Sequence, residues 1–209
     1  MHSSNEHPGL SWLARLHNGL VHRRRVRVLV EMLAHELPKG ASILDIGCGD
    51  GMLAHLLAES RPDIAIEGVE VSVRPGCRIP CRLFTGGKLP FDDSSFDVCL
   101  FIDVLHHSDE LNPLIQEARR VCRSSILIKD HLSENAIDRH TLQIMDWVGN
   151  RPHGVRLPFN YLSKEQWLRV FHEERLKIEK WISDVPLYSF PLSLIVGRGL
   201  HFVAVLKKI

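Results

Sequence analysis

The chain has 209 residues, of which 44% are hydrophobic and 24% charged, and its formal net charge is +1. This size allows one globular domain whose sheet is covered on both faces, and the balanced charge excludes recruitment of nucleic acid by a strong overall positive field. The first eight residues are polar and no apolar run approaches the roughly 20 residues of a membrane span, so we expect a cytoplasmic protein.

The N-terminal region carries apolar residues at nearly helical spacing over residues 10–37, and Pro38-Lys-Gly40 ends the pattern. We predict two helices here, in a capping region over residues 1–40. The short basic cluster at residues 22–27 is interpreted as a solvated helix face beside the active site. A contact with phosphate or a membrane surface is the alternative.

A glycine-rich turn follows the first predicted strand, which contains Asp45 near its end. Glycines at 47, 49 and 51 let the main chain turn sharply and bring bare amides against a ligand. The dinucleotide fingerprint needs its third glycine three residues after the second, whereas here it comes two residues after. The pattern DxGxGxG therefore predicts a cofactor loop other than the dinucleotide type.

The second predicted strand, residues 64–70, is mostly β-branched and ends at Glu70. A carboxylate at the carboxyl end of a strand can accept hydrogen bonds from both hydroxyls of a ribose. Because NAD enzymes share this feature, it predicts nucleoside binding more than a particular reaction.

Strands and helices alternate further along the chain. We predict strands near 82–85, 97–102 and 125–129, a helix over 110–122, a helix opened by a capping box at Ser163 to Gln166, and strands over 177–182 and 200–206. Such alternation predicts an α/β fold with parallel strands and crossover helices.

Three segments together resemble the class I S-adenosylmethionine-dependent methyltransferases, in particular their UbiE-like small-molecule branch (methyltransferase type 11). They are the DxGxGxG loop at 45–51, the string LPFDDSSFDV at 89–98 and the segment VLHH at 104–107. The resemblance covers roughly residues 40–130. It implies a Rossmann-like, doubly wound, mostly parallel seven-stranded sheet with an antiparallel C-terminal strand, in a methyltransferase domain over residues 41–209.

The resemblance also implies S-adenosylmethionine as cofactor and a set of residues that bind it: Asp45, Gly47, Gly49, Glu70, Thr85, Gly86, Leu89, Asp103 and His106. The family usually has an acid where Thr85 stands, so we expect the Thr85 hydroxyl and the Gly86 amide to contact the adenine. Two prolines and a glycine between Glu70 and Leu83 replace the family's usual helix. We expect a trimmed crossover that leaves one side of the adenine pocket open.

A segment at about residues 132–162 is too long for a plain connection. We expect it to form a lid, with a helix near 135–148, above the carboxyl ends of the strands, where open α/β sheets bind ligands. Methyl transfer from a sulfonium is an in-line displacement, so positioning dominates and a base is helpful without being obligatory.

His131 is the preferred candidate for that base, oriented by its neighbour Asp130, and His107 is a further catalytic candidate. The alternative is that residues 129–131 only fix the lid through hydrogen bonds. For His106 and His107 we favour packing on the cofactor side over catalysis, because the resembled family has histidine there across unrelated acceptors.

Five cysteines are scattered along the chain and do not form a disulfide framework. Cys77 and Cys81 are the closest pair, and an isolated CxxxC is a weak zinc signal. We therefore expect no metal, with zinc at this pair as the alternative, and we expect Cys48 to face the core behind the cofactor loop.

The sequence thus predicts methyl transfer to a small-molecule acceptor that is aromatic, quinone-like, polyketide or lipid-like, because aromatic residues gather between residues 147 and 171. A nucleic-acid methyltransferase and a non-catalytic cofactor-binding scaffold protein are the alternatives. We expect no nucleic-acid partner, no membrane span, and a monomer or homodimer.

Overall fold

The computed structural model describes residues 23–73, 75–108, 110–150, 158–190, 192–197 and 199–209. The predicted helical residues 10–22 and the predicted lid loop around 151–157 lie outside these ranges. Among the described residues, no helix combines the length and the apolar composition needed to cross a membrane.

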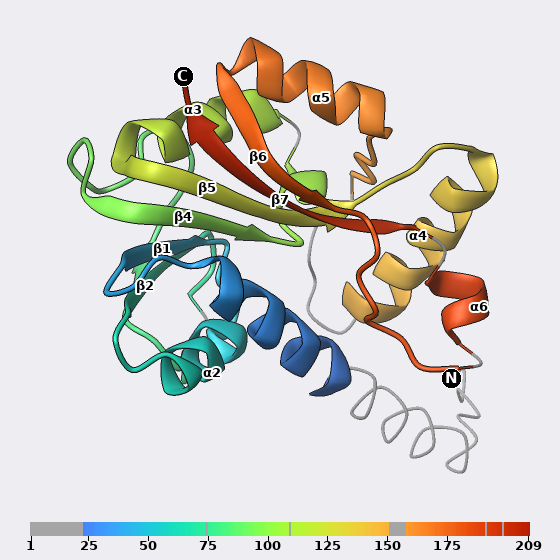
Figure 1. Ribbon diagram of the computed structural model, residues 1–209, viewed down its shortest axis with the longest axis horizontal. Helices are drawn as coiled ribbons and strands as arrows, with labels where there is room; N and C mark the ends of the chain where they lie inside the picture. Colours follow the sequence, from blue (N-terminus) through green and yellow to red (C-terminus); the bar gives the residue numbers. More distant parts are fainter. Residues whose placement is uncertain (1–22, 74, 109, 151–157, 191, 198) are drawn as a thin grey trace, which may run out of the picture.

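Seven strands form a single sheet in the order β3-β2-β1-β4-β5-β7-β6 (Figure 1). The strands are β1 (Ser42–Ile46), β2 (Ala65–Glu70), β3 (Cys81–Leu83), β4 (Phe96–Ile102), β5 (Cys122–His131), β6 (Leu176–Ile182) and β7 (His201–Lys208). Strand β7 runs antiparallel to both of its neighbours, and the other six strands are parallel. The predicted mostly parallel sheet with an antiparallel C-terminal strand is confirmed.

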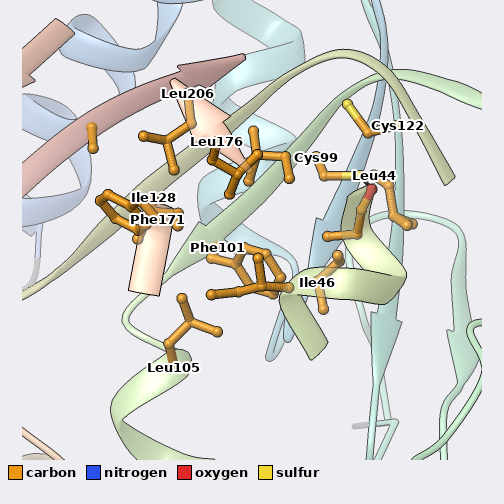
Figure 2. Packing of buried hydrophobic residues seen from close by; sticks show 14 of the residues in the cluster. Leu44, Ile46, Cys99, Phe101, Leu105, Cys122, Ile128, Phe171, Leu176 and Leu206 are labelled. Atoms are coloured by element: carbon orange, nitrogen blue, oxygen red, sulfur yellow. Dashed lines mark hydrogen bonds between the residues drawn. The ribbon is translucent and has the colours of Figure 1, made fainter. Parts of the chain in front are cut away.

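The central strands are buried on both faces because helices cover the sheet from both sides. A helix over residues 23–36 and α2 (Met52–Ser60) pack on one face, and α3 (Leu111–Val121) and α5 (Lys164–Glu173) pack on the other (Figure 1). Strands covered in this way are nearly continuous apolar runs, as β1 and β4 are. Figure 2 shows part of the second face, where Phe171 of α5 lies close to Ile128 of β5.

Local sequence signals set several element boundaries. The Ser163 side chain accepts a hydrogen bond from the Gln166 amide, and the Gln166 side chain accepts one from the Ser163 amide. The predicted capping box is therefore confirmed, and it opens α5. Residues 71–80 contain turns and bends between β2 and β3, with no helix or strand in their described part, as the prolines predict.

Three elements lie over the carboxyl end of the sheet. Helix α4 (Ala136–Asn150) forms within the predicted lid segment. The short 3-10 helix η1 (Leu105–His107) and helix α6 (Ser193–Val196) were not predicted, because each is too brief for hydrophobic periodicity to reveal.

Candidate cofactor and acceptor site

The glycine loop is anchored to the end of β2 and leaves space above it. Gly47, Gly49 and Gly51 have φ angles of 79°, 60° and 70°, a region that favours glycine. The Gly47 amide donates a hydrogen bond of 2.8 Å to the carbonyl of Val69. A Cβ atom at Gly49 would meet nothing within 4 Å. The loop therefore has room for a ligand at Gly49.

Glu70 is held against this loop by two backbone donors. Its Oε2 accepts a hydrogen bond of 2.8 Å from the Gly49 amide, and its Oε1 accepts one of 2.8 Å from the Val71 amide. Each carboxylate oxygen has a further lone pair. The carboxylate is thus positioned to accept hydrogen bonds from two ribose hydroxyls.

Asp45 lies in β1, just before the loop, and its side chain is almost fully buried. Burial, with a smaller effect of the Glu70 charge, raises the pKa of Asp45 to about 7. A cation next to this carboxylate would favour its charged form. The ammonium group of an amino-acid moiety is such a cation, so Asp45 and Glu70 together fit a cofactor that joins an amino acid to a nucleoside.

The adenine side of the site is open. Thr85 and Gly86 follow β3 and are exposed, and a Cβ atom at Gly86 would meet nothing within 4 Å. Leu89, by contrast, is 1% exposed in the core, and its amide donates a hydrogen bond of 2.7 Å to Oε2 of Glu117. Cofactor contacts by these three residues stay predictions.

On the acceptor side, Asp103 is the first residue after β4 and has a φ angle of 57°. It forms an ion pair with the fully buried Lys129, and its Oδ2 lies 3.1 Å from a guanidinium nitrogen of Arg25. Burial raises the pKa of Asp103, but Lys129, His131 and Arg25 more than offset burial and hold the pKa well below its ordinary value. The carboxylate is therefore charged and engaged by two cations, and its contact with a cofactor stays a prediction.

Asp130, at the end of β5, connects the two predicted histidine segments. Its Oδ1 lies 2.7 Å from Nδ1 of His106 and 3.3 Å from Nδ1 of His131. Its Oδ2 accepts a hydrogen bond of 3.0 Å from the Leu105 amide. Residues from η1 and β5 thus meet around one buried carboxylate.

The two histidines that contact Asp130 differ in charge. Burial lowers the pKa of His106, but the Asp130 carboxylate outweighs burial and the net pKa is raised. Burial and then the charge of His106 lower the pKa of His131. His106 is accordingly cationic and His131 neutral near pH 7, and a neutral imidazole is the form that can accept a proton.

The third candidate, His107, is half-buried, and burial followed by the His106 charge lowers its pKa to about 4. Within the described residues, no hydrogen-bond partner reaches its Nδ1 atom. Like His131, it is a neutral imidazole near pH 7. The catalytic roles of His131, Asp130 and His107 stay predictions.

The lid segment lies directly on this cluster. The Tyr161 hydroxyl donates a hydrogen bond to Oδ2 of Asp146 in α4, and the same oxygen lies 3.4 Å from Nε2 of His106. The ring centroid of Tyr161 is 5.8 Å from those of both His106 and His131. Trp167 is buried in the core instead, so it does not contribute to an apolar lid surface.

Several residues of the buried network were not among the predicted site residues: Arg25, Lys129, Asp146, Tyr161 and His201. Arg25 belongs to the basic cluster interpreted as solvated, yet it reaches across to Asp103. A signal existed for Lys129, because a lysine inside an apolar strand must find a partner. For His201 the signal is only the antiparallel pairing that sets it opposite His131.

The fold is that of class I S-adenosylmethionine-dependent methyltransferases. A family model described as a methyltransferase domain matches residues 20–180, more than half of the chain. The chain belongs to this methyltransferase family, whose cofactor is S-adenosylmethionine.

Two curated relatives match a smaller part of the chain than the family model does. The 27-O-demethylrifamycin SV methyltransferase of Amycolatopsis mediterranei is 32% identical over 110 residues, covering 46% of this chain and 40% of the relative. The demethylmenaquinone methyltransferase of Tropheryma whipplei is 31% identical over 93 residues, covering 40% and 38%. The matches therefore span less than half the length of either relative.

Solved structures match nearly the whole fold. A chain from the complex with the Haloferax volcanii Trm112 methyltransferase activator has a TM-score of 0.68 at 14% identity, covering 98% of this chain and 99% of that one. An S-adenosylmethionine-dependent methyltransferase from Thermotoga maritima has a TM-score of 0.66 at 20% identity, covering 93% and 95%. At such identities the likeness establishes the fold alone.

Proposed function

We propose that the chain catalyses methyl transfer from S-adenosylmethionine to a small-molecule acceptor by in-line displacement. The observation that carries this proposal is the arrangement at the carboxyl ends of β1 and β2. There the Gly49 amide fixes Glu70 at 2.8 Å beside the buried Asp45, within the segment that the family model matches.

Each of these residues has a defined task. When bound, the cofactor supplies an electrophilic methyl group on a sulfonium. Glu70 accepts hydrogen bonds from the ribose hydroxyls, the charged form of Asp45 pairs with the ammonium group, and Gly49 leaves space above the loop. Such fixed positioning can supply about 7 to 11 kcal/mol of the barrier reduction.

Two observations favour a small-molecule acceptor. The described lid segments lie against the histidines through Tyr161 and exclude water from the cluster. The resembled relatives act, by their names, on demethylrifamycin and demethylmenaquinone.

We assign the role of base to His131, for acceptors whose nucleophilic atom carries a proton. Burial lowers the pKa of His131, and the charged form of His106, favoured by Asp130, lowers it further, so the His131 imidazole is neutral near pH 7. A positioned base of this type contributes about 10²- to 10⁴-fold in rate.

The proposal is tested in two steps. Calorimetric titration with S-adenosylhomocysteine should give one binding site per chain in the wild type and none in the Glu70→Ala variant. Incubation with methyl-labelled S-adenosylmethionine and fractionated cell extract should then label a compound of low molecular mass. Label only in RNA or protein would contradict the acceptor class. Cofactor binding without label in any compound would favour the cofactor-binding scaffold protein, and absence of cofactor binding would contradict the proposal as a whole.

A further inference from the structure

Three cysteines from separate parts of the chain converge beside the cofactor loop. Cys48 lies within the loop, Cys77 in the crossover after β2, and Cys81 at the start of β3. The sulfur atoms of all three lie within 4.8 Å of one another, and those of Cys48 and Cys81 are 3.4 Å apart. The expectation that Cys48 faces the core was wrong, because it is only partly buried and points toward Cys81.

The backbone around these sulfurs is shaped to let them approach. A Cβ atom at Gly68 would lie 2.5 Å from Sγ of Cys48, and one at Gly51 would lie 3.2 Å from Sγ of Cys77. Glycine at both positions therefore leaves room for the two sulfurs. The crossover is also tied to the loop by the Arg78 amide, which donates a hydrogen bond of 3.0 Å to the Asp50 carbonyl.

The geometry matches that of thiolates around a soft divalent cation. Zinc–sulfur bonds of about 2.3 Å in a tetrahedral site set neighbouring sulfurs about 3.8 Å apart, within the range seen here. The spacing of Cys77 and Cys81, with three residues between them, is that of many zinc-binding loops. A disulfide would use two sulfurs and would leave the convergence of the third unexplained.

We propose that Cys48, Cys77 and Cys81 bind one zinc-class metal ion. Binding replaces three sulfur–hydrogen bonds by three metal–sulfur bonds and releases three protons to solvent, and a water completes the tetrahedron. The ion joins the trimmed crossover and β3 to the cofactor loop. It thereby takes the place of the packing that a crossover helix would otherwise provide.

The site is tested by titrating tag-free, fully reduced protein with Cd²⁺ under anaerobic conditions. Thiolate coordination gives an ultraviolet charge-transfer band, which separates these sulfurs from the imidazole and carboxylate groups near His106. We expect one equivalent of Cd²⁺ to bind with this band, and we expect Cd²⁺ to displace Zn²⁺ that was bound beforehand. The melting temperature should rise by about 3 to 6 °C for each tenfold excess of Zn²⁺ over its Kd.

Substitutions of single cysteines test which side chains bind the metal ion. Cys77→Ser lies in an irregular loop and should leave the metal-free melting temperature nearly unchanged, while weakening Zn²⁺ binding by more than about 100-fold, since even loss of an outer-shell partner costs 10- to 100-fold. Cys81→Ser should have the same effect on Zn²⁺ binding. Cys122→Ser, which removes a thiol from the core, is the matched control and should leave Zn²⁺ affinity unaltered.

Three results would overturn the proposal. They are a charge-transfer band that is absent at one equivalent of Cd²⁺, Zn²⁺ affinity that is unchanged in Cys77→Ser and Cys81→Ser, and a Cys48–Cys81 disulfide found by mass spectrometry in protein isolated without reductant. Because the readouts are metal binding and melting, they do not depend on the methyltransferase activity.

Discussion

Oδ1 of Asp130 lies 2.7 Å from Nδ1 of His106 and 3.3 Å from Nδ1 of its own neighbour, His131. The adjacent pair in the sequence is therefore not the closest pair in space. Asp130 favours the charged form of His106, and burial followed by that charge lowers the pKa of His131. The candidate base is thus set by three residues from two elements, η1 and β5.

The His131→Gln variant should lower the rate of methyl transfer by about 10²- to 10⁴-fold while the Kd for S-adenosylhomocysteine stays within about threefold of the wild type. The measurement is single-turnover transfer to the acceptor found by labelling. His107→Gln is the parallel variant. If His131→Gln keeps the full rate, residues 129–131 serve only to fix the lid.

Histidine burial predicts loss of stability in mild acid. The pKa of His107 in the folded chain is lowered to about 4, so between pH 6.5 and 4 the unfolded state binds a proton that the folded state does not. The free energy of unfolding should therefore decrease as the pH is lowered from 6.5 to 4. His107→Gln should reduce the fall by about 1 to 3 kcal/mol in urea unfolding, and an unchanged fall in this variant would contradict the prediction.

The contribution of Asp45 to stability depends on pH in the opposite direction, because the pKa of Asp45 is raised to about 7 in the folded chain. The folded state then holds a proton that the unfolded state has lost, so this residue costs stability as pH rises from about 4 to 7. In the absence of cofactor, Asp45→Asn should be about 2 to 4 kcal/mol more stable than wild type at pH 8, with a smaller gain at pH 5. It should also bind S-adenosylhomocysteine at least about tenfold more weakly in calorimetry. A variant less stable than wild type at pH 8 would contradict the prediction.

The Gly49→Ala variant tests whether the cofactor occupies the open space at Gly49. A control variant separates this effect from the cost of backbone strain. Alanine at a φ angle of 60° costs about 1 to 2 kcal/mol, and its Cβ atom projects into the open space above the loop. Gly40→Ala is the matched control, because Gly40 has a φ angle of 68°, meets nothing within 4 Å and lies before β1. Both variants should lose similar stability, and Gly49→Ala alone should weaken S-adenosylhomocysteine binding, by more than about tenfold. Equal cofactor affinity in the two variants would remove Gly49 from the site.

Tyr161→Phe tests whether the lid is held by its hydrogen bond to Asp146. Removing the hydroxyl leaves a buried carboxylate oxygen without that donor, a cost of about 1 to 3 kcal/mol. Amide hydrogen exchange in α4 should accelerate, while exchange in β1 and β4 should not change. Tyr188→Phe, at the chain's other tyrosine, provides the comparison. Unchanged exchange in α4 would mean that packing, without this hydrogen bond, holds the lid.

Local sequence patterns were sufficient for most of the fold. Apolar or alternating runs predicted all seven strands, and the Ser163 to Gln166 capping box predicted the start of α5. Such signals depend on neighbours within a few residues, which is why they can be read directly. The short elements η1 and α6 carry no periodic signal, and they were missed.

The glycine loop was also predicted from the sequence, because Asp45, the glycines and Glu70 lie at or just beyond the ends of neighbouring parallel strands, which meet at one edge of the sheet. The partners of the buried charges were decided only by tertiary structure. Arg25 and Asp103 are 78 residues apart, Cys48 and Cys81 are 33 apart, and His106 and Asp130 are 24 apart. Contacts at such separations are set by how helices and strands pack, and burial then determines which groups hold charge, so no local pattern in the chain encodes them.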